Sequence, residues 1–342
     1  MIKKNYYKVA ALSTAAAALL AFGGCGDSNG SSTYEYIVTP TGHVFDGNTY
    51  GVGGIKDMEV SDSGETLYAG TNSDTSGLVI INTTNGDYNI IDSGSAGRSV
   101  KLSADGQSVY VGGGSSETLY AVDRTTQTVT QEINLTSTGS GVALTDNGKT
   151  AYVGGLVGAF QNVNLETGDV NVTDVNSSYG WWIPQLELSN DESDLYLASS
   201  ELLIYHFADG NYTHIGTNGG IVNFDVSKDN EKLYASNESS IQVIDLTTDT
   251  NIGSITEINA TDSFGWIKGV KVTKDNRRLF IADRNYNDTL FMVNLENNNT
   301  VTAIMNESNI TCYQPDSVEI SPKGNRIYLG CYNGVIIEYG VK

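Results

Sequence analysis

Few residues in this 342-residue chain are of the types that usually bind metals or haem, since it has only three histidines and three cysteines. No histidine stands at a metal-ligand spacing, and the haem-attachment motif CxxCH does not occur. A G-x-S-x-G nucleophile elbow and a phosphate-binding loop are also missing from the sequence. We therefore expect no metal and no cofactor, and no motif identifies a catalytic residue.

Basic residues are scarce as well, with 19 lysines and arginines against 40 acidic residues and a net charge of −21. This balance argues against nucleic acid as a partner, because binding to its phosphates depends on clustered lysine and arginine. The simplest interpretation of the charge is the solubility of an exported surface. Cleavage after residue 24 would remove three lysines and no acidic residue, giving a net charge of −24.

Helical periodicity is missing after residue 24, and strand-turn-strand patterns take its place. The stretch SADGQSVYVGG at 103–113 contains a tight turn at Asp105-Gly106, followed by residues that favour strands. Six similar segments begin at 61, 145, 189, 227, 273 and 321, so the spacing runs from 38 to 48 residues. A second hairpin follows the copies, and one repeat therefore holds four short strands.

Repeats of this length with four strands are typical of β-propeller blades. We expect an all-β fold in which seven blades stack radially, because a single blade cannot bury its own faces. The last repeat ends after its third strand, GVIIEYG at 334–340. We expect YEYIV at 34–38, or a nearby segment, to supply the missing outer strand and so close the ring. Residues 34–342 would then form one domain.

Two elements of the repeat carry a resemblance to a known family. S-x-D-G-x-x-x-Y-V, as in SADGQSVYV, and V-I-D-x-x-T, as in VIDLTT, resemble the repeats of seven-bladed YVTN-type propellers, a group that includes lactonase-like proteins. The resemblance covers roughly residues 34–342 and implies the seven-bladed architecture. It also implies lactone hydrolysis as one possible activity, but no catalytic position can be carried over, because such repeats support many functions.

The N-terminus, MIKKNYYKVAALSTAAAALLAFGGC, has the pattern of a secretory signal, since three lysines precede an apolar run that is too short to span a membrane. FGGC resembles the lipobox of bacterial lipoproteins, with Cys25 as the lipidated residue. The alternative is ordinary cleavage that leaves Cys25 as a free thiol. We expect residues 1–24 to be the signal peptide and residues 25–33 a flexible tether. The protein would be membrane-anchored in the periplasm or at the cell surface.

The other two cysteines, Cys312 and Cys331, both belong to the last repeat. Cys312 lies in the loop that enters its first strand, and Cys331 lies at the end of its second strand. Antiparallel neighbours place these two positions at the same face, and an exported protein permits a disulfide. Two free thiols or half of a metal site are the alternatives. We favour the disulfide, because no nearby histidine completes a metal set.

Eight of the 32 asparagines stand in the pattern Asp/Glu-x-Asn-x-Ser/Thr. This pattern extends the general acceptor Asn-x-Ser/Thr and resembles the acceptor of bacterial N-glycosylation systems. The alternative is that these residue types are simply common in the turns of a propeller. The predicted glycosylation sites are Asn29, Asn134, Asn171, Asn176, Asn211, Asn259, Asn298 and Asn309.

The loops before first strands and after second strands gather on one face of a propeller, where ligands and partners often bind. All three tryptophans lie in two similar segments of this kind, SSYGWWIP at 177–184 and DSFGWIKG at 262–269. We expect this face to bind an envelope protein or a small ligand, or else its aromatic residues to cover the blade ends as a lid. The residues concerned are Tyr179, Trp181, Trp182, Phe264 and Trp266, with Tyr50, Tyr286, Tyr313 and Tyr332 in loops of the same face.

Two positions of the repeat carry charge near the channel mouth. Five residues before the turn Ser/Thr stand Lys56, Arg98 and Lys268, which predicts a spot that attracts anions. Three residues further on are charges that we expect to pair between blades as a structural ring. The members of this ring are Glu59, Lys101, Glu187, Asp225, Lys271 and Glu319. The alternative is a ligand site in the channel, in which Glu187 and Asp225 act as a carboxylate pair.

Taken together, these features favour an exported, lipid-anchored propeller that binds a partner or serves as a scaffold at the cell envelope. A lactonase-like hydrolase at the channel mouth is the first alternative. A docking partner of an envelope redox or assembly complex is the second.

Overall fold

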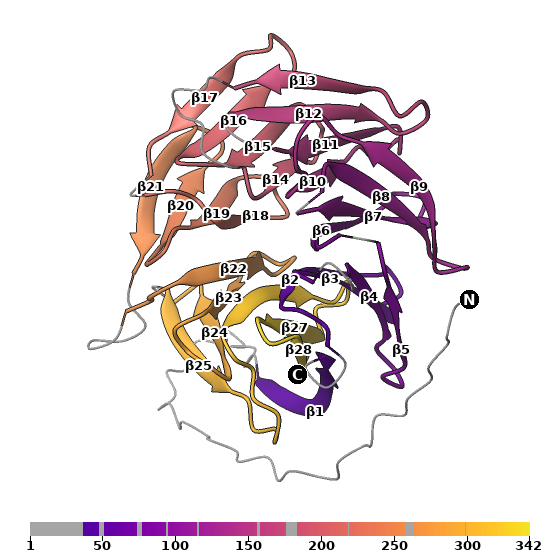
Figure 1. The fold of residues 1–342 in the computed structure, drawn as a ribbon. Coiled ribbons are helices and arrows are strands. Elements are labelled where there is room, and N and C mark those ends of the chain that lie inside the picture. The colour runs from indigo at the N-terminus through magenta and orange to yellow at the C-terminus, as the bar shows by residue number, and fades with distance from the viewer. Residues whose placement is uncertain are drawn as a thin grey trace.

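The computed structural model describes residues 37–47, 51–73, 77–93, 95–114, 116–155, 158–175, 183–217, 219–256, 263–297 and 299–342. Seven four-stranded antiparallel sheets form a ring, which confirms the predicted seven-bladed β-propeller (Figure 1). Figure 1 shows first strands such as β6, β10, β14 and β18 toward the middle and last strands such as β9, β13, β17 and β21 at the rim. Within these ranges no helix is long and apolar enough to cross a membrane.

The first four blades follow one another along the chain. Blade 1 contains β2 (Ile55–Val60), β3 (Thr66–Thr71), β4 (Leu78–Asn82) and β5 (Tyr88–Ile91). Blade 2 contains β6 (Gly97–Leu102), β7 (Ser108–Gly113), β8 (Thr118–Asp123) and β9 (Thr128–Asn134). Blade 3 contains β10 (Val142–Leu144), β11 (Thr150–Gly154), β12 (Ala159–Asn164) and β13 (Val170–Asp174). Blade 4 contains β14 (Leu186–Leu188), β15 (Asp194–Ala198), β16 (Leu202–His206) and β17 (Tyr212–Ile215).

The remaining blades complete the ring. Blade 5 contains β18 (Asn223–Val226), β19 (Lys232–Ser236), β20 (Ile241–Asp245) and β21 (Thr250–Ile255). Blade 6 contains β22 (Ile267–Val272), β23 (Arg278–Asp283), β24 (Thr289–Asn294) and β25 (Thr300–Met305). Blade 7 contains β26 (Pro315–Ile320), β27 (Arg326–Cys331), β28 (Val335–Val341) and, from the other end of the chain, β1 (Val38–Asp46).

One turn geometry explains why the repeat motif returns. In every blade the hydroxyl oxygen of the turn Ser or Thr accepts the backbone N–H of the residue five positions later, at 2.9 to 3.1 Å. The residue three positions after the hydroxyl has a positive φ, which Gly and Asn tolerate best. These residues are Gly64, Gly106, Gly148, Glu192, Asn230, Asn276 and Gly324.

A second repeated feature joins the inner strands of neighbouring blades. In blades 1, 2, 4 and 5, the side chain four residues before the turn hydroxyl accepts a backbone N–H from the first strand of the next blade. Asp57 accepts the Val100 N–H at 2.9 Å in this way, and Asn223 accepts the N–H of Val270 at 3.0 Å. Where Gly269 takes this position, an added Cβ would lie 2.9 Å from the Cα of Ser317, so the neighbouring backbone fills the space instead.

The ring closes through β1, which pairs antiparallel with β28, the third strand of blade 7. The closing strand therefore comes from the N-terminal part of the chain, as expected, and it begins at the last residue of the segment 34–38 and continues into the adjacent residues. Only Val38 is shared with β1, and residues 34–36 lie outside the described residues. Pro40 and a register shift between Pro40 and Val44 suit an outermost strand, since one edge needs no ladder partner.

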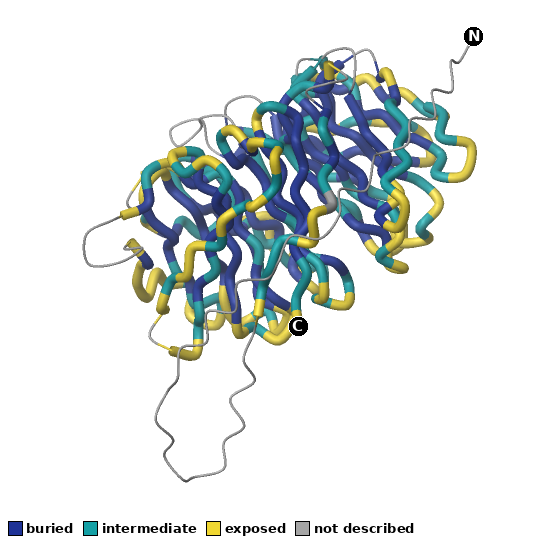
Figure 2. Tube along the Cα trace, turned by 90° about the horizontal axis from the view of Figure 1, so that it is seen from below, coloured by how far each residue is buried: buried dark blue, intermediate teal, exposed yellow. Residues whose placement is uncertain are grey.

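Apolar side chains between adjacent blades form the core. The described residues give seven hydrophobic clusters, and each draws on two neighbouring blades. Figure 2 shows that buried residues run along the strands, whereas exposed residues gather at the turns. The solvent-exposed loops therefore lie at the two ends of the strands. These two surfaces of the ring are where we look for a binding site.

Candidate functional site

Three cations and two aromatic rings alternate where blades 6, 7 and 1 meet. The Lys268 Nζ lies 4.7 Å from the centroid of the Trp266 ring. The Arg284 guanidinium carbon lies 4.8 Å from Trp266 and 5.1 Å from Tyr332. The Lys56 Nζ lies 4.8 Å from the Tyr332 centroid. Cations at such distances are attracted by the ring faces. We call these five side chains the cation–aromatic ladder.

Asp316 in β26 is the carboxylate of this region. Its Oδ1 accepts the Arg284 Nε–H at 2.8 Å and lies 2.7 Å from Arg284 Nη2, and its Oδ2 forms an ion pair with Lys56. The Asp316 side chain is only 4 % exposed, so burial strengthens these contacts. Within the described part of the chain, the ion pairs involve Lys56 and Arg284 but not Lys268.

A buried carboxylate fixes the loop that presents Trp266. Asp283, at the end of β23, is fully buried and accepts the N–H groups of Gly265 at 2.8 Å and Trp266 at 2.9 Å. Phe264 is also buried and packs edge-on against Phe291, with ring centroids 5.6 Å apart. Phe264 thus belongs to the covering of the blade end, whereas Trp266 keeps 37 % of its surface exposed.

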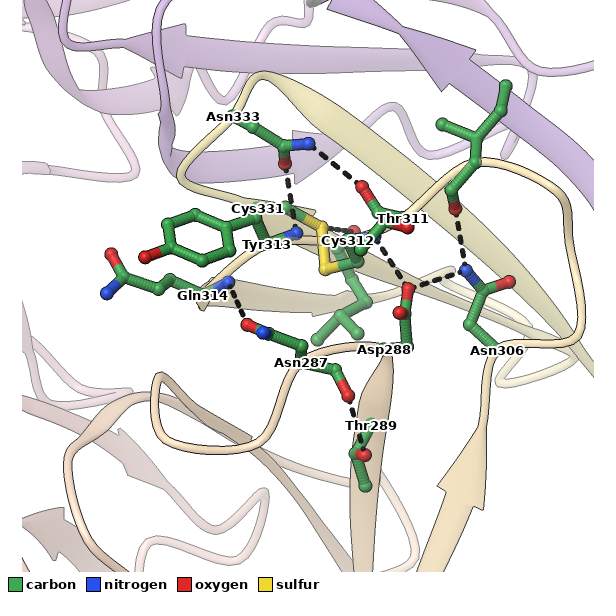
Figure 3. The surroundings of a disulfide bond; sticks show 12 residues. Asn287, Asp288, Thr289, Asn306, Thr311, Cys312, Tyr313, Gln314, Cys331 and Asn333 are labelled. Atoms are coloured by element: carbon green, nitrogen blue, oxygen red, sulfur yellow. Dashed lines mark hydrogen bonds between the residues drawn. A yellow bond between two sulfur atoms is a disulfide. The ribbon is translucent and has the colours of Figure 1, made fainter.

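A disulfide holds the loops on the blade 7 side of the ladder. The sulfurs of Cys312 and Cys331 are 1.99 Å apart, and the bond is surrounded by a hydrogen-bond network that Figure 3 shows. Asp288 accepts the Cys312 N–H at 2.7 Å, and the Tyr332 N–H donates to the Tyr313 carbonyl at 3.0 Å. Tyr313 and Tyr332 directly follow the two cysteines and remain 48 % and 42 % exposed. The disulfide therefore fixes the backbone from which both rings project.

Neighbouring charges act differently on the pKa values of the two lysines in the ladder. Burial lowers the pKa of Lys56; Asp316 opposes this shift, whereas the charges of Arg284 and Arg98 add to it. Burial also lowers the pKa of Lys268, and Arg284 lowers it further. At Lys56 the carboxylate of Asp316 outweighs the two arginines, whereas at Lys268 the positive charges of Arg284 and Lys56 outweigh the carboxylates of Asp316 and Glu238.

The inner ring of charges pairs between blades, as the sequence predicted for Lys271. Its Nζ lies 3.2 Å from Asp225 and 3.5 Å from Glu319, in the blades on either side. Burial acts downward on the pKa of Lys101, but neighbouring carboxylates, Glu59 first among them, raise it above its usual value. Glu59 also accepts the Leu102 N–H of the next blade at 3.2 Å, and Asp225 accepts that of Val272 at 2.7 Å. These contacts favour the structural role of the ring over a ligand site.

Burial is the largest single cause acting on the pKa values of Glu187, Glu319 and Lys271, but the net direction of the shift differs between the carboxylates and the lysine. It raises the pKa of Glu187, with the charge of Asp225 as the next cause, and raises the pKa of Glu319 to about 7 although Lys271 opposes the shift. For Lys271 burial acts downward, but Asp225 and Glu319 outweigh it and hold the pKa well above its usual value. The ring is thus a buried, mutually dependent set of charges.

The structure brings only part of the predicted binding set together. Lys56, Lys268 and Trp266 all belong to the ladder, and Arg98 lies close enough to lower the pKa of Lys56. Tyr179, Trp181 and Trp182 lie outside the described residues, as does Cys25. Sequence reasoning missed Arg284, which connects the two rings. Its position directly after a second strand, on the face already considered, was the available signal.

Four of the predicted glycosylation sites can be located. Asn134, at the end of β9, and Asn171, within β13, are exposed, and so are Asn211 and Asn309 in turns or loops. Asn134 and Asn171 thus lie in strands. The Asn211 side chain donates to Asp209 at 2.9 Å. The other sites, Asn29, Asn176, Asn259 and Asn298, lie outside the described residues.

Comparison with known proteins supports the fold and goes no further. No family model and no curated protein sequence matches the chain. Among solved structures, a chain of hydrazine synthase from Kuenenia stuttgartiensis is similar, with a TM-score of 0.74 and 14 % identity, over 84 % of this chain and 95 % of that chain. At this identity the likeness concerns architecture alone, and the resemblance to YVTN-type repeats stays a prediction. The chain is thus a seven-bladed β-propeller, a fold that suits a binding or scaffold module.

Proposed function

We propose that this chain is a lipid-anchored binding module of the cell envelope, and that the cation–aromatic ladder is the centre of its binding surface. The observation that carries the proposal is the exposure of Trp266, Tyr332 and Tyr313 beside three cations on one face. Aromatic residues and arginine are the types most enriched where binding energy is concentrated. In a protein of net charge −21, such a grouping of cations is a local exception.

Two further features support the proposed location at the cell envelope. The secretory pattern of residues 1–24 ends at the lipobox-like FGGC, so Cys25 would carry the lipid. The disulfide between Cys312 and Cys331 suits an oxidising compartment outside the cytosol. A Cys25→Ser variant tests the anchor. We expect it to leave the membrane fraction for the soluble envelope fraction, whereas wild-type protein stays with the membrane.

The binding role is tested by site-specific photo-crosslinking in cells. A photo-reactive residue in place of exposed Tyr313 should give one discrete crosslinked product, and a Trp266→Ala change in the same protein should abolish it. The same photo-reactive residue at Ile252, which is 54 % exposed on strand β21, is the matched control and should give no such product. An equal pattern at both positions would contradict a binding surface at the ladder.

The lactonase-like alternative gains no specific support. The carboxylates that it would use, Glu187 and Asp225, belong to the inner ring, where Asp225 is paired with Lys271 and with a backbone N–H. We therefore retain binding as the proposed function. Glycosylation at the exposed asparagines is a separate proposal, which intact-mass measurement of protein from its native cell tests directly.

A further inference from the structure

We propose that the cation–aromatic ladder is an oxyanion-binding site, which holds a carboxylate or phosphate group of the ligand between Lys268, Arg284 and Lys56. This inference rests on the proposed function and names the chemical class that the same site recognises. It differs from a site in which sugar or peptide groups simply stack on exposed tryptophan and tyrosine rings.

The rings of the ladder are already engaged by cations. Trp266 has Lys268 and Arg284 within 4.8 Å of its centroid, and Tyr332 has Lys56 and Arg284 within 5.1 Å. Ring contacts hold a cation through its charge and leave its N–H donors available. The aromatic residues therefore position the cations without using their N–H donors, and the side chains of Lys56 and Arg284 keep 18 % and 13 % of their surface exposed.

The three cations of the ladder carry more N–H donors than Asp316 accepts. Arg284 directs Nε and Nη2 at one oxygen of Asp316, while a guanidinium carries five N–H donors and an ammonium carries three. Two other carboxylates are nearby. Asp283 accepts three backbone N–H groups, from Gly265, Trp266 and Asn285. Glu238 raises the pKa of Lys268 through its charge, but no ion pair joins the two within the described residues. A second oxyanion beside Asp316 would accept hydrogen bonds from the N–H donors that have no acceptor among the contacts described above.

The electrostatics point to the same class of ligand. Burial lowers the pKa of both lysines, and at Lys268 the charges of Arg284 and Lys56 lower it further against the opposing effect of Asp316 and Glu238. An added negative charge beside Lys268 would therefore stabilise its ammonium group. The planar fork of Arg284 matches the geometry of carboxylate and phosphate oxygens. Lys268 is the key residue, because no ion pair occupies it within the described residues.

The test is calorimetric titration of the purified protein with inorganic phosphate and with galacturonate, at constant ionic strength set by chloride. We expect saturable binding of at least one of them, and the preferred anion tells phosphate recognition from carboxylate recognition. Lys268→Gln should weaken this binding by about tenfold. The matched control Lys149→Gln removes the same charge from a 62 % exposed lysine and should change the affinity less than about twofold.

Asp316→Asn separates anion binding from a purely structural clamp between the blades. The change removes the internal competitor for Arg284 and Lys56, so an oxyanion site should bind its anion more tightly. Thermal unfolding shows whether Asp316→Asn is folded. If it is not, the comparison of Lys268→Gln with Lys149→Gln by calorimetric titration tests the inference. Weaker binding by folded Asp316→Asn, or equal losses in Lys268→Gln and Lys149→Gln, would overturn the inference.

The two proposals fail in distinguishable ways. If neither anion binds the wild-type protein but the crosslink at Tyr313 depends on Trp266, the binding function stands and the oxyanion inference is wrong. If an anion binds with the expected variant pattern but no crosslinked product forms, the site recognises a small anion, and a macromolecular partner at this face is excluded.

Discussion

Among single residues, Glu319 is expected to make the stability of the protein depend on pH. Its carboxyl group is buried among the inner charges, and burial raises its pKa from 4.5 to about 7 in the folded protein. The folded state therefore holds the proton more tightly than the unfolded state between these two values. Stability contributed by protonated Glu319 is present at low pH and is lost as the pH rises through about 7.

The Glu319→Gln variant should remove this dependence. Between pH 5 and pH 8, we expect the free energy of unfolding of the wild type to fall by on the order of 2 kcal/mol relative to the variant. Urea unfolding at a series of pH values measures the difference. Glu166→Gln, at a 64 % exposed carboxylate, is the control and should follow the wild type. Parallel curves for all three proteins would show that Glu319 does not titrate in this range.

At the scale of the element, the turn hydroxyl connects the two inner strands of each blade. In blade 5, Ser227 accepts the Lys232 N–H at 2.9 Å and donates to Asp229 at 2.6 Å. Ser227→Ala leaves a backbone donor without this acceptor, and we expect a loss of about 1 kcal/mol in the free energy of unfolding. Ser254→Ala, at an exposed strand position, should change it by less than about 0.5 kcal/mol. Denaturant unfolding compares the two variants, and equal effects would contradict a special role for the hydroxyl.

The disulfide acts on the same scale, since it joins the loop before β26 to the end of β27. Cysteines 19 positions apart close a short loop, and the double variant Cys312→Ser/Cys331→Ser should lose roughly 3 kcal/mol of stability. Thermal unfolding with and without reductant measures this. A reductant should destabilise the wild type and leave the variant unchanged. If the oxidised wild type and the variant melt together, the disulfide contributes nothing to stability.

The repeat could be predicted from sequence because its signal is local. The hydroxyl, the turn residue with positive φ and the partner N–H lie within six positions, so a pattern such as SADGQSVYV reports the geometry directly. The contacts between blades could not be predicted equally well. Asp57, Ser99, Gln185 and Asn223 share one position and one role but no residue type, and their partners lie about 40 positions away. The role of Arg284 could not be predicted for the same reason, because its contacts with Trp266, Asp316 and Tyr332 join positions that are far apart in the sequence.

At the scale of the whole molecule, β1 completes blade 7, because this N-terminal strand is the outermost strand of a sheet whose other three strands are C-terminal. It covers β28, whose residues Ile337 and Tyr339 are buried. An exposed edge of this kind promotes pairing with other chains. Deletion of residues 1–46 should therefore give dimers or aggregates in size-exclusion chromatography, whereas deletion of residues 1–36 should give the same monomer or oligomer as the full chain. Identical elution of both truncated proteins would show that β1 is dispensable.

The closing strand has one more consequence, because it brings Ile37 and Lys342 together as neighbours. Their backbones exchange two hydrogen bonds, at 3.2 and 3.0 Å. A short peptide could join these positions, and the chain could then be opened at an exposed turn between two other strands. Such a circular permutant would contain seven blades in the same order around the ring, with blade 7 built from one continuous stretch. The fold would then depend on the order of the blades around the ring and not on the position of the chain termini.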